Sequence, residues 1–202
     1  ISGSRKYLLG YQAAMLREAG FAVAAADYRL APETKLEEIA TDIRNALDWV
    51  QGEGARLFGW DGERVAVMGS SAGGYLSLLC GTFEDKPKAL VSFYGYGDIL
   101  GEWYTRPSVH YCNTMAPIAL ADAEKSVGGR EKSSGGNQRY LYYFYCRQQG
   151  IWPQAVSGWD PVTEREQFLP YCPVYNVGTG YPPVLLLHGD ADTDVPYEQS
   201  EL

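Results

Sequence analysis

Histidine is scarce in this sequence, and the cysteines do not form a metal-binding pattern. His110 and His188 are the two histidines among 202 residues. Zinc sites usually draw their ligands from closely spaced pairs, and the cysteines lack such spacing, so a metal site is not expected. No disulfide framework can be deduced either, which favours a reducing compartment such as the cytoplasm. The four cysteines are Cys80, Cys112, Cys146 and Cys172.

Long apolar runs and an excess of basic charge are also missing. No stretch of eighteen apolar residues occurs, so no membrane span is expected. Lys and Arg total 17 against 25 Asp and Glu, a net charge of −8. This balance argues against nucleic acid or an anionic membrane surface as a partner. Hydrophobic residues make up 46% of the sequence, as in soluble globular proteins, and we expect one domain over residues 1–202.

The order of the periodic segments predicts an α/β fold. Residues 4–19 carry apolar side chains at a spacing near 3.6, which predicts a helix. The unbroken apolar run at 21–26 predicts a strand covered on both faces, as in a parallel sheet. Helix and strand continue to alternate, which is typical of an open, mostly parallel sheet with helices on both faces. The later helices are expected over 36–50 and from the glycines at 73 and 74 to about 83, and the later strands over 64–68, 88–94 and 184–187.

The alternation is interrupted before the last expected strand. The interval at 95–180, between the expected strands at 88–94 and 184–187, holds six prolines, a Gly/Ser-rich segment at 128–136 and an aromatic cluster at 140–145. Because long connections inside a compact domain often cover an active site, we expect a lid or insertion over residues 96–180. The aromatic cluster has two compatible interpretations: a helix that packs the insertion onto the core, and a surface that contacts a ligand.

The junction at Ser71 carries the clearest chemical pattern. A Val-rich run ends at Gly69, and Ser71 and Gly73 follow before an apolar helix. The pattern Gly-x-Ser-x-Gly between a strand and a helix is typical of a nucleophile elbow, a strained turn that presents a Ser hydroxyl. A side chain at 69 or 73 is expected to collide with a neighbouring element, and the N–H of Ala72 is placed to donate to an oxyanion. The alternative is an ordinary helix N-cap, with Ser70 as the capping residue.

A Ser nucleophile needs a base, usually a His that a carboxylate orients. The loop after the last expected strand offers three carboxylates, Asp190, Asp192 and Asp194. Three motifs, of which this loop is the last, together resemble the α/β-hydrolase superfamily. They most closely resemble its esterase/lipase branch, which is related to hormone-sensitive lipase and bacterial acetyl esterases. The motifs are Gly69-Ser70-Ser71-Ala72-Gly73-Gly74, Asp27-Tyr28-Arg29-Leu30-Ala31-Pro32-Glu33 and His188-Gly189-x-x-Asp192-x-x-Val195-Pro196.

The resemblance implies roles for individual residues. It makes Ser71 the nucleophile, the Ala72 N–H an oxyanion donor and Asp192 the triad acid, with Asp190 or Asp194 as alternatives. Asp27 and Arg29 would be structural residues beside the site. No cofactor or metal is implied. The expected activity is hydrolysis of carboxylic esters with small or medium acyl chains, and a small-molecule ester is the expected partner.

Two departures from the family pattern are informative. The family's His-Gly-Gly oxyanion loop is absent, and no His follows Asp192 as the order Ser, Asp, His requires. His188 resembles a structural position, and His110 lies between Ser71 and Asp192, the wrong order for this fold. These departures indicate a partial chain whose catalytic His lies outside it.

A partial chain carries two further expectations. Without a neighbour for the strand at 21–26, the isolated polypeptide is expected to be poorly stable or locally rearranged, and without the base it is expected to be inactive. The alternatives in function are a prolyl-oligopeptidase-like peptidase, and a non-catalytic binding module or inactive fragment of the same fold.

Overall fold

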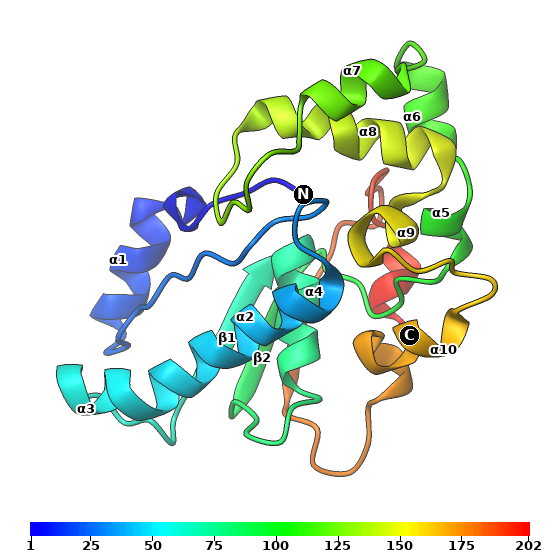
Figure 1. Cartoon of the computed structure of the whole chain (residues 1–202). Helices are drawn as coiled ribbons and strands as arrows, with labels where there is room; N and C mark the ends of the chain where they lie inside the picture. The colour runs from blue at the N-terminus through cyan, green and yellow to red at the C-terminus, as the bar shows by residue number, and fades with distance from the viewer.

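A three-stranded parallel sheet lies at the centre of the computed structural model, which describes residues 1–202 (Figure 1). Its strands are β1 (Ala66–Ser70), β2 (Ala89–Phe93) and β3 (Val184–Leu187), in that spatial order. Met68 lies opposite Val91 and Val91 opposite Leu185. Since all three strands run in the same direction, their carboxyl ends share one edge of the sheet, and the loops that follow them meet there.

Two helices cover one face of this sheet. Helix α4 (Ala72–Cys80) follows β1 directly, packs on β1 and β2, and is buried from Gly74 to Cys80. Helix α2 (Leu36–Trp49) packs on α4 through an apolar stripe that includes Ile39 and Leu47. The prediction of a helix at 36–50 and of another after Ser71 is thereby confirmed. The hydrophobic core lies between α2, α4, the sheet and the segment that connects β2 to β3.

Side chains on the opposite face of the sheet are partly exposed. Met68 has 42% of its surface exposed and Leu185 56%. The two belong to the same face, because each is paired in register with Val91. A parallel sheet normally has both faces covered, so this apolar face is an unusual surface.

The prediction of a strand at 21–26 is wrong. Residues 21–29 adopt no regular structure, and Phe21 is 57% exposed. No strand lies beside this segment to complete its hydrogen bonds, so its apolar sequence alone does not make it a strand. Ion pairs hold the segment instead, with Arg5 bound to Asp27 and Arg29 to Asp42.

The first helix is shorter than expected and lies on the surface. The helix predicted over 4–19 is divided into a 3₁₀ turn, η1 (Arg5–Tyr7), and α1 (Gly10–Glu18), and neither buries a residue. Figure 1 shows α1 at the edge of the molecule. A π-helical turn, η2 (Val50–Gly54), and α3 (Ala55–Phe58) extend α2.

Short helices make up the segment between β2 and β3. In Figure 1, α6, α7 and α8 lie together as a layer apart from the sheet. The aromatic cluster at 140–145 is helical, as one of its two interpretations expects, and begins α8. The helices are α5 (Glu102–Thr105), α6 (Val109–Thr114), α7 (Leu120–Lys125), α8 (Tyr140–Gln149), α9 (Trp152–Ser157) and α10 (Arg165–Phe168), with 3₁₀ turns η3 (Asn137–Arg139), η4 (Leu169–Tyr171), η5 (Pro173–Tyr175) and, after β3, η6 (Tyr197–Ser200).

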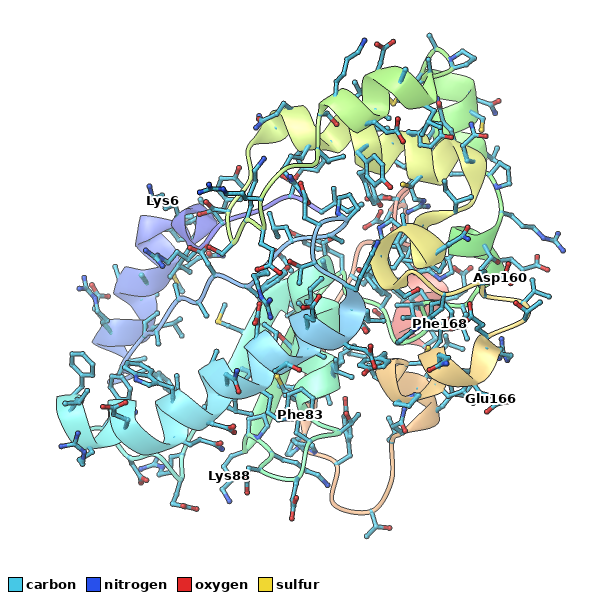
Figure 2. All side chains as sticks on the ribbon, in the orientation of Figure 1. Lys6, Phe83, Lys88, Asp160, Glu166 and Phe168 are labelled. Atoms are coloured by element: carbon cyan, nitrogen blue, oxygen red, sulfur yellow. The ribbon has the colours of Figure 1, made fainter.

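Aromatic packing and a buried ion pair join this segment to the body. Tyr75 of α4 stacks on Tyr96 with ring centroids 5.0 Å apart. Arg139, 1% exposed, makes two hydrogen bonds of 2.8 and 2.6 Å to the carboxylate of Glu33. Figure 2 shows Phe83 and Phe168 in the body of the molecule, where both are buried. No helix has the length and apolar character needed to cross a membrane.

Candidate active site

Ser71 occupies a strained junction between β1 and α4. Its backbone has φ 53° and ψ −120°, and only one other non-glycine residue has a positive φ. A positive φ is costly for a residue with a Cβ and persists only where neighbouring contacts enforce it. Two contacts do so here: the Ser71 N–H donates to the carbonyl of Phe93 at 2.9 Å, and its carbonyl accepts from Tyr75 at 3.0 Å.

The junction is not an ordinary capped helix start. The Ser71 side chain makes no capping hydrogen bond, and Ser70 is the last residue of β1. The hydroxyl of Ser71 is therefore not used to complete the helix. Ala72 is the first residue of α4, where backbone N–H groups lack intrahelical acceptors. The junction is thus a strained turn with an uncapped hydroxyl between a parallel strand and a helix.

The steric expectation for the elbow glycines holds at one position and is wrong at the other. A Cβ on Gly69 would lie 2.3 Å from the carbonyl oxygen of Gly73, so no larger residue fits there. A Cβ on Gly73 would meet nothing within 4 Å. The close approach lies one residue later, where a Cβ on Gly74 would lie 2.7 Å from Ser92 Oγ and 2.9 Å from Gly95 Cα. Gly74 therefore allows α4 to pack against the end of β2.

The loop after β3 fixes the carboxylate of Asp192. Its Oδ1 accepts hydrogen bonds from the N–H groups of Asp194 at 2.8 Å and Val195 at 3.0 Å. Its own N–H donates to the carbonyl of Gly189. The side chain remains 23% exposed, and Oδ2 takes no hydrogen bond from the loop. One oxygen is thus held by the backbone while the other stays available to a partner.

The other two carboxylates of the loop are differently placed. Asp190 is exposed. Asp194 accepts from the hydroxyl of Tyr143 at 2.6 Å and from Arg147 Nη1 at 2.8 Å. Burial and the adjacent Asp194 carboxylate raise the pKa of Tyr143 well above its usual value, so this hydroxyl keeps the proton that it donates. Asp194 is therefore already committed to two side chains of α8.

Neither histidine is joined to Ser71. The His188 side chain is 1% exposed, with Nδ1 2.7 Å from Ser200 Oγ and Nε2 3.0 Å from the carbonyl oxygen of Val195. A carbonyl can only accept, so we assign the proton to Nε2 and let Nδ1 accept from Ser200. His188 thus holds the loop together, as the resemblance implied. His110 lies on α6 with its ring 5.0 Å from that of Tyr111.

Ser71 and Asp192 lie at the same edge of the sheet. Ser71 follows the end of β1, the Asp192 loop follows the end of β3, and β2 lies between these two strands. No hydrogen bond links the two residues. Tyr94, which sequence reasoning missed, follows β2 at this edge with φ 40° and 43% exposure. No motif marks it, because a positive φ at a tyrosine has no sequence signature.

Two surface hollows lie away from Ser71. One, of about 480 Å³, is lined by α7 and α8 and includes Tyr140 and Phe144. The other, of about 340 Å³, includes Arg44 of α2 and Tyr171. Ser71 lines neither. The arrangement therefore presents a serine on a strained strand–helix turn and a loop-held carboxylate at one sheet edge.

Comparison with solved structures shows the fold. An α/β hydrolase superfamily protein from Enterococcus faecalis has a TM-score of 0.72 and 24% identity, and the match covers 100% of this chain and 71% of that one. A protein of unknown function from Staphylococcus aureus has a TM-score of 0.70 and 27% identity, with 87% and 60% covered. The fold is therefore that of the α/β hydrolases, which confirms the predicted fold class.

Comparison of sequences gives relatives and a family. The non-reducing polyketide synthase ausA of Aspergillus calidoustus is 27% identical over 248 residues, which is 98% of this chain and 10% of that protein. The chain thus spans about a tenth of the length of this curated relative. A family model described as BD-FAE matches residues 1–118, more than half of the chain. The α/β-hydrolase and esterase resemblance of the motifs is thereby confirmed, and the chain belongs to the BD-FAE family.

Proposed function

We propose that the protein is a serine hydrolase of carboxylic esters. The observation that carries the proposal is the backbone of Ser71, held at φ 53° between a parallel strand and a helix in a member of the BD-FAE family. An elbow of this geometry lifts a hydroxyl clear of the backbone, where it can attack a carbonyl carbon. The Ala72 N–H, at the start of α4, would donate to the oxyanion that forms.

Asp192 is the proposed acid of the triad. Its Oδ1 is fixed by two backbone N–H groups, and its Oδ2 is available. Such a carboxylate can accept from the Nδ1–H of a histidine, keep the ring in the correct tautomer and stabilise the imidazolium that forms during attack. Asp194 is the weaker candidate because Arg147 and Tyr143 already occupy its Oδ1.

The proposed base is a histidine outside these 202 residues. Both ring nitrogens of His188 already have partners, and His110 lies on α6 with no hydrogen bond to Ser71 or Asp192. A base must come within about 3 Å of the hydroxyl proton that it abstracts. In the proposed reaction it takes the proton of Ser71 during attack and returns it to the leaving alcohol, and water then releases the acyl group by the same route.

The segment at 96–180 is the proposed lid and determinant of acyl length. Its helix α8 presents tyrosines on several sides, with Tyr143 and Tyr145 packed toward the core and Tyr140 40% exposed. In this proposal, aromatic side chains of the segment line the acyl-binding site and favour small or medium acyl groups.

The test is turnover of p-nitrophenyl acetate, butyrate and decanoate by the full-length protein, which carries the proposed base, and by its Ser71→Ala and Ser70→Ala variants. We expect turnover of the short esters that Ser71→Ala reduces by about 10³-fold or more. Ser70→Ala is the matched control, and we expect it to stay within a few fold of the wild type. Turnover that survives Ser71→Ala would refute the proposal. Complete absence of turnover and of covalent labelling in the full-length protein would favour a binding module.

Thioesters are a second class of acyl donor to assay, because relatives that match nearly the whole chain are polyketide synthases. A Ser nucleophile attacks oxoesters and thioesters at the same carbonyl carbon. Comparing kcat/KM for p-nitrophenyl butyrate, a butyryl thioester and a peptide p-nitroanilide distinguishes esterase, thioesterase and peptidase activity. We expect the anilide to be the poorest substrate.

A further inference from the structure

Arg147 connects the segment at 96–180 to the loop that carries Asp192. Its side chain is 3% exposed and lies on α8. Nη1 donates to Asp194 Oδ1 at 2.8 Å, and Nη2 donates to the backbone carbonyl of Asp194 at 3.1 Å. The guanidinium therefore holds both the side chain and the main chain of one loop residue. Such a two-point contact fixes orientation as well as position.

Aromatic rings hold the guanidinium in place. Its Cζ lies 4.7 Å from the ring centroid of Tyr104, 5.2 Å from that of Trp103 and 5.5 Å from that of Tyr111. Nη1 also donates to the hydroxyl of Tyr143 at 2.9 Å. Cation–π contacts are strongest where water is excluded, as it is here. Arg147 thus has little freedom to move away from the loop.

The loop transmits this constraint to Asp192 over a short path. The N–H of Asp194 and that of Val195 are the two donors to Asp192 Oδ1. Arg147 holds the side chain of Asp194 and its carbonyl, and that carbonyl belongs to the same peptide unit as the Val195 N–H, one of the two donors. Its removal would release the segment that orients the carboxylate, although Arg147 itself touches no reacting atom.

We infer that Arg147 is a positioning residue for Asp192, through which the packing of α8 sets the alignment of the proposed catalytic acid. The inference rests on the proposed function, since it assumes that Asp192 is the acid. It assigns the insertion a role beyond covering the site. An insertion that loses its packing on the body would then also misalign the acid, so substrate access and catalytic competence would change together.

Arg139 provides a matched control. It lies on η3, immediately before α8, is 1% exposed and pairs with a carboxylate, that of Glu33. Its other partners are the carbonyl oxygens of Ile1 and Ala31. None of these partners belongs to the loop after β3. Loss of Arg139 therefore disturbs the same insertion without disturbing Asp192.

The experiment compares Arg147→Met, Arg147→Lys and Arg139→Met in the full-length protein, which carries the proposed base. Steady-state kinetics on p-nitrophenyl butyrate are measured across pH, together with thermal unfolding. For Arg147→Met we expect kcat to fall about 10- to 100-fold with KM changed less than about threefold, because misplacement of a catalytic group costs rate more than binding. Arg147→Lys keeps one donor and should recover part of kcat.

The pH profile distinguishes positioning from structural support. A base that loses its carboxylate partner becomes easier to deprotonate, so its pKa falls and the acid limb of kcat/KM moves to lower pH. We expect this shift in both Arg147 variants. Arg139→Met should lower the unfolding temperature while leaving the acid limb in place.

Two results would overturn the inference. One is a kcat and an acid limb in Arg147→Met that match those of Arg139→Met. The other, if Arg147→Met does not fold, is an Arg147→Lys variant with wild-type kcat and pH profile. Residual turnover in Ser71→Ala is a separate result, because it would refute the proposed function whatever the Arg147 variants do.

Discussion

Asp192 and His188 are neighbours that do not share a hydrogen bond. Asp192 Oδ2 lies 3.6 Å from His188 Nε2, yet that nitrogen is 3.0 Å from the carbonyl oxygen of Val195 and is directed to it. The imidazole thus ties the start of the loop to its end. Asp192 keeps an oxygen free, while the nearest histidine is already committed to the structure of the loop.

The first prediction concerns the choice among the loop carboxylates. Asp192→Asn should lower kcat about 10³- to 10⁴-fold, because an amide cannot stabilise the imidazolium or hold the base in its correct tautomer. Asp190→Asn is the control. Asp190 is exposed, so its variant should keep wild-type kcat. The measurement is kcat on p-nitrophenyl butyrate, and equal losses in the two variants would contradict the assignment of Asp192.

The second prediction concerns the elbow glycines. Gly69→Ala should lower the free energy of unfolding by about 1–3 kcal/mol or more, since its Cβ would lie 2.3 Å from the carbonyl oxygen of Gly73 and the backbone must move. Gly73→Ala meets nothing within 4 Å and lies in α4, so the same measurement should give no loss, or a gain of about 0.5–1 kcal/mol from helix propensity. Urea unfolding of both variants tests this, and the reverse order would show that the junction is built differently.

The third prediction concerns the buried pair of Glu33 and Arg139. Burial opposes ionisation of Glu33, but the hydrogen bonds from Arg139 and from backbone N–H groups outweigh it and lower its pKa from 4.5 to about 2. A depressed folded-state pKa means that the stabilisation is present above pH 4.5 and is lost as the pH falls toward 2. Glu33→Gln should therefore be less stable than the wild type by about 3 kcal/mol at pH 7.

The difference between the wild type and Glu33→Gln should shrink between pH 4.5 and pH 2. The control is Glu102→Gln, which removes an exposed ion pair with Arg106 and should change stability by less than about 0.5 kcal/mol. Urea unfolding at several pH values measures both. A Glu33→Gln deficit that stays constant down to pH 2 would contradict the depressed pKa.

Local patterns predicted those parts of the fold that depend on near neighbours in sequence. The expected strands at 88–94 and 184–187 are found at 89–93 and 184–187, and the turn at Ser71 is where its glycines indicated. The run at 21–26 has the same apolar character but forms no strand, because a strand also needs a neighbour for its hydrogen bonds. Periodicity carries no information about that neighbour.

In the candidate site, too, features set by near neighbours in the sequence could be predicted, and features set by distant residues could not. Ser71 and Asp192 could be proposed from motifs, but the contact of Arg147 with Asp194 spans 47 residues and has no motif. The prediction of a steric clash at Gly73 is wrong, because what a Cβ at that position would contact depends on how α4 packs against the sheet. That packing places the tight contact at Gly74, against Gly95 at the end of β2.

The most direct test of the account is to label the full-length protein, which carries the proposed base, with a fluorophosphonate and map the adduct by peptide mass spectrometry. The account predicts one adduct, on Ser71, that disappears in Ser71→Ala and persists in Ser70→Ala. An adduct on any other residue, or labelling that Ser71→Ala leaves intact, would contradict it.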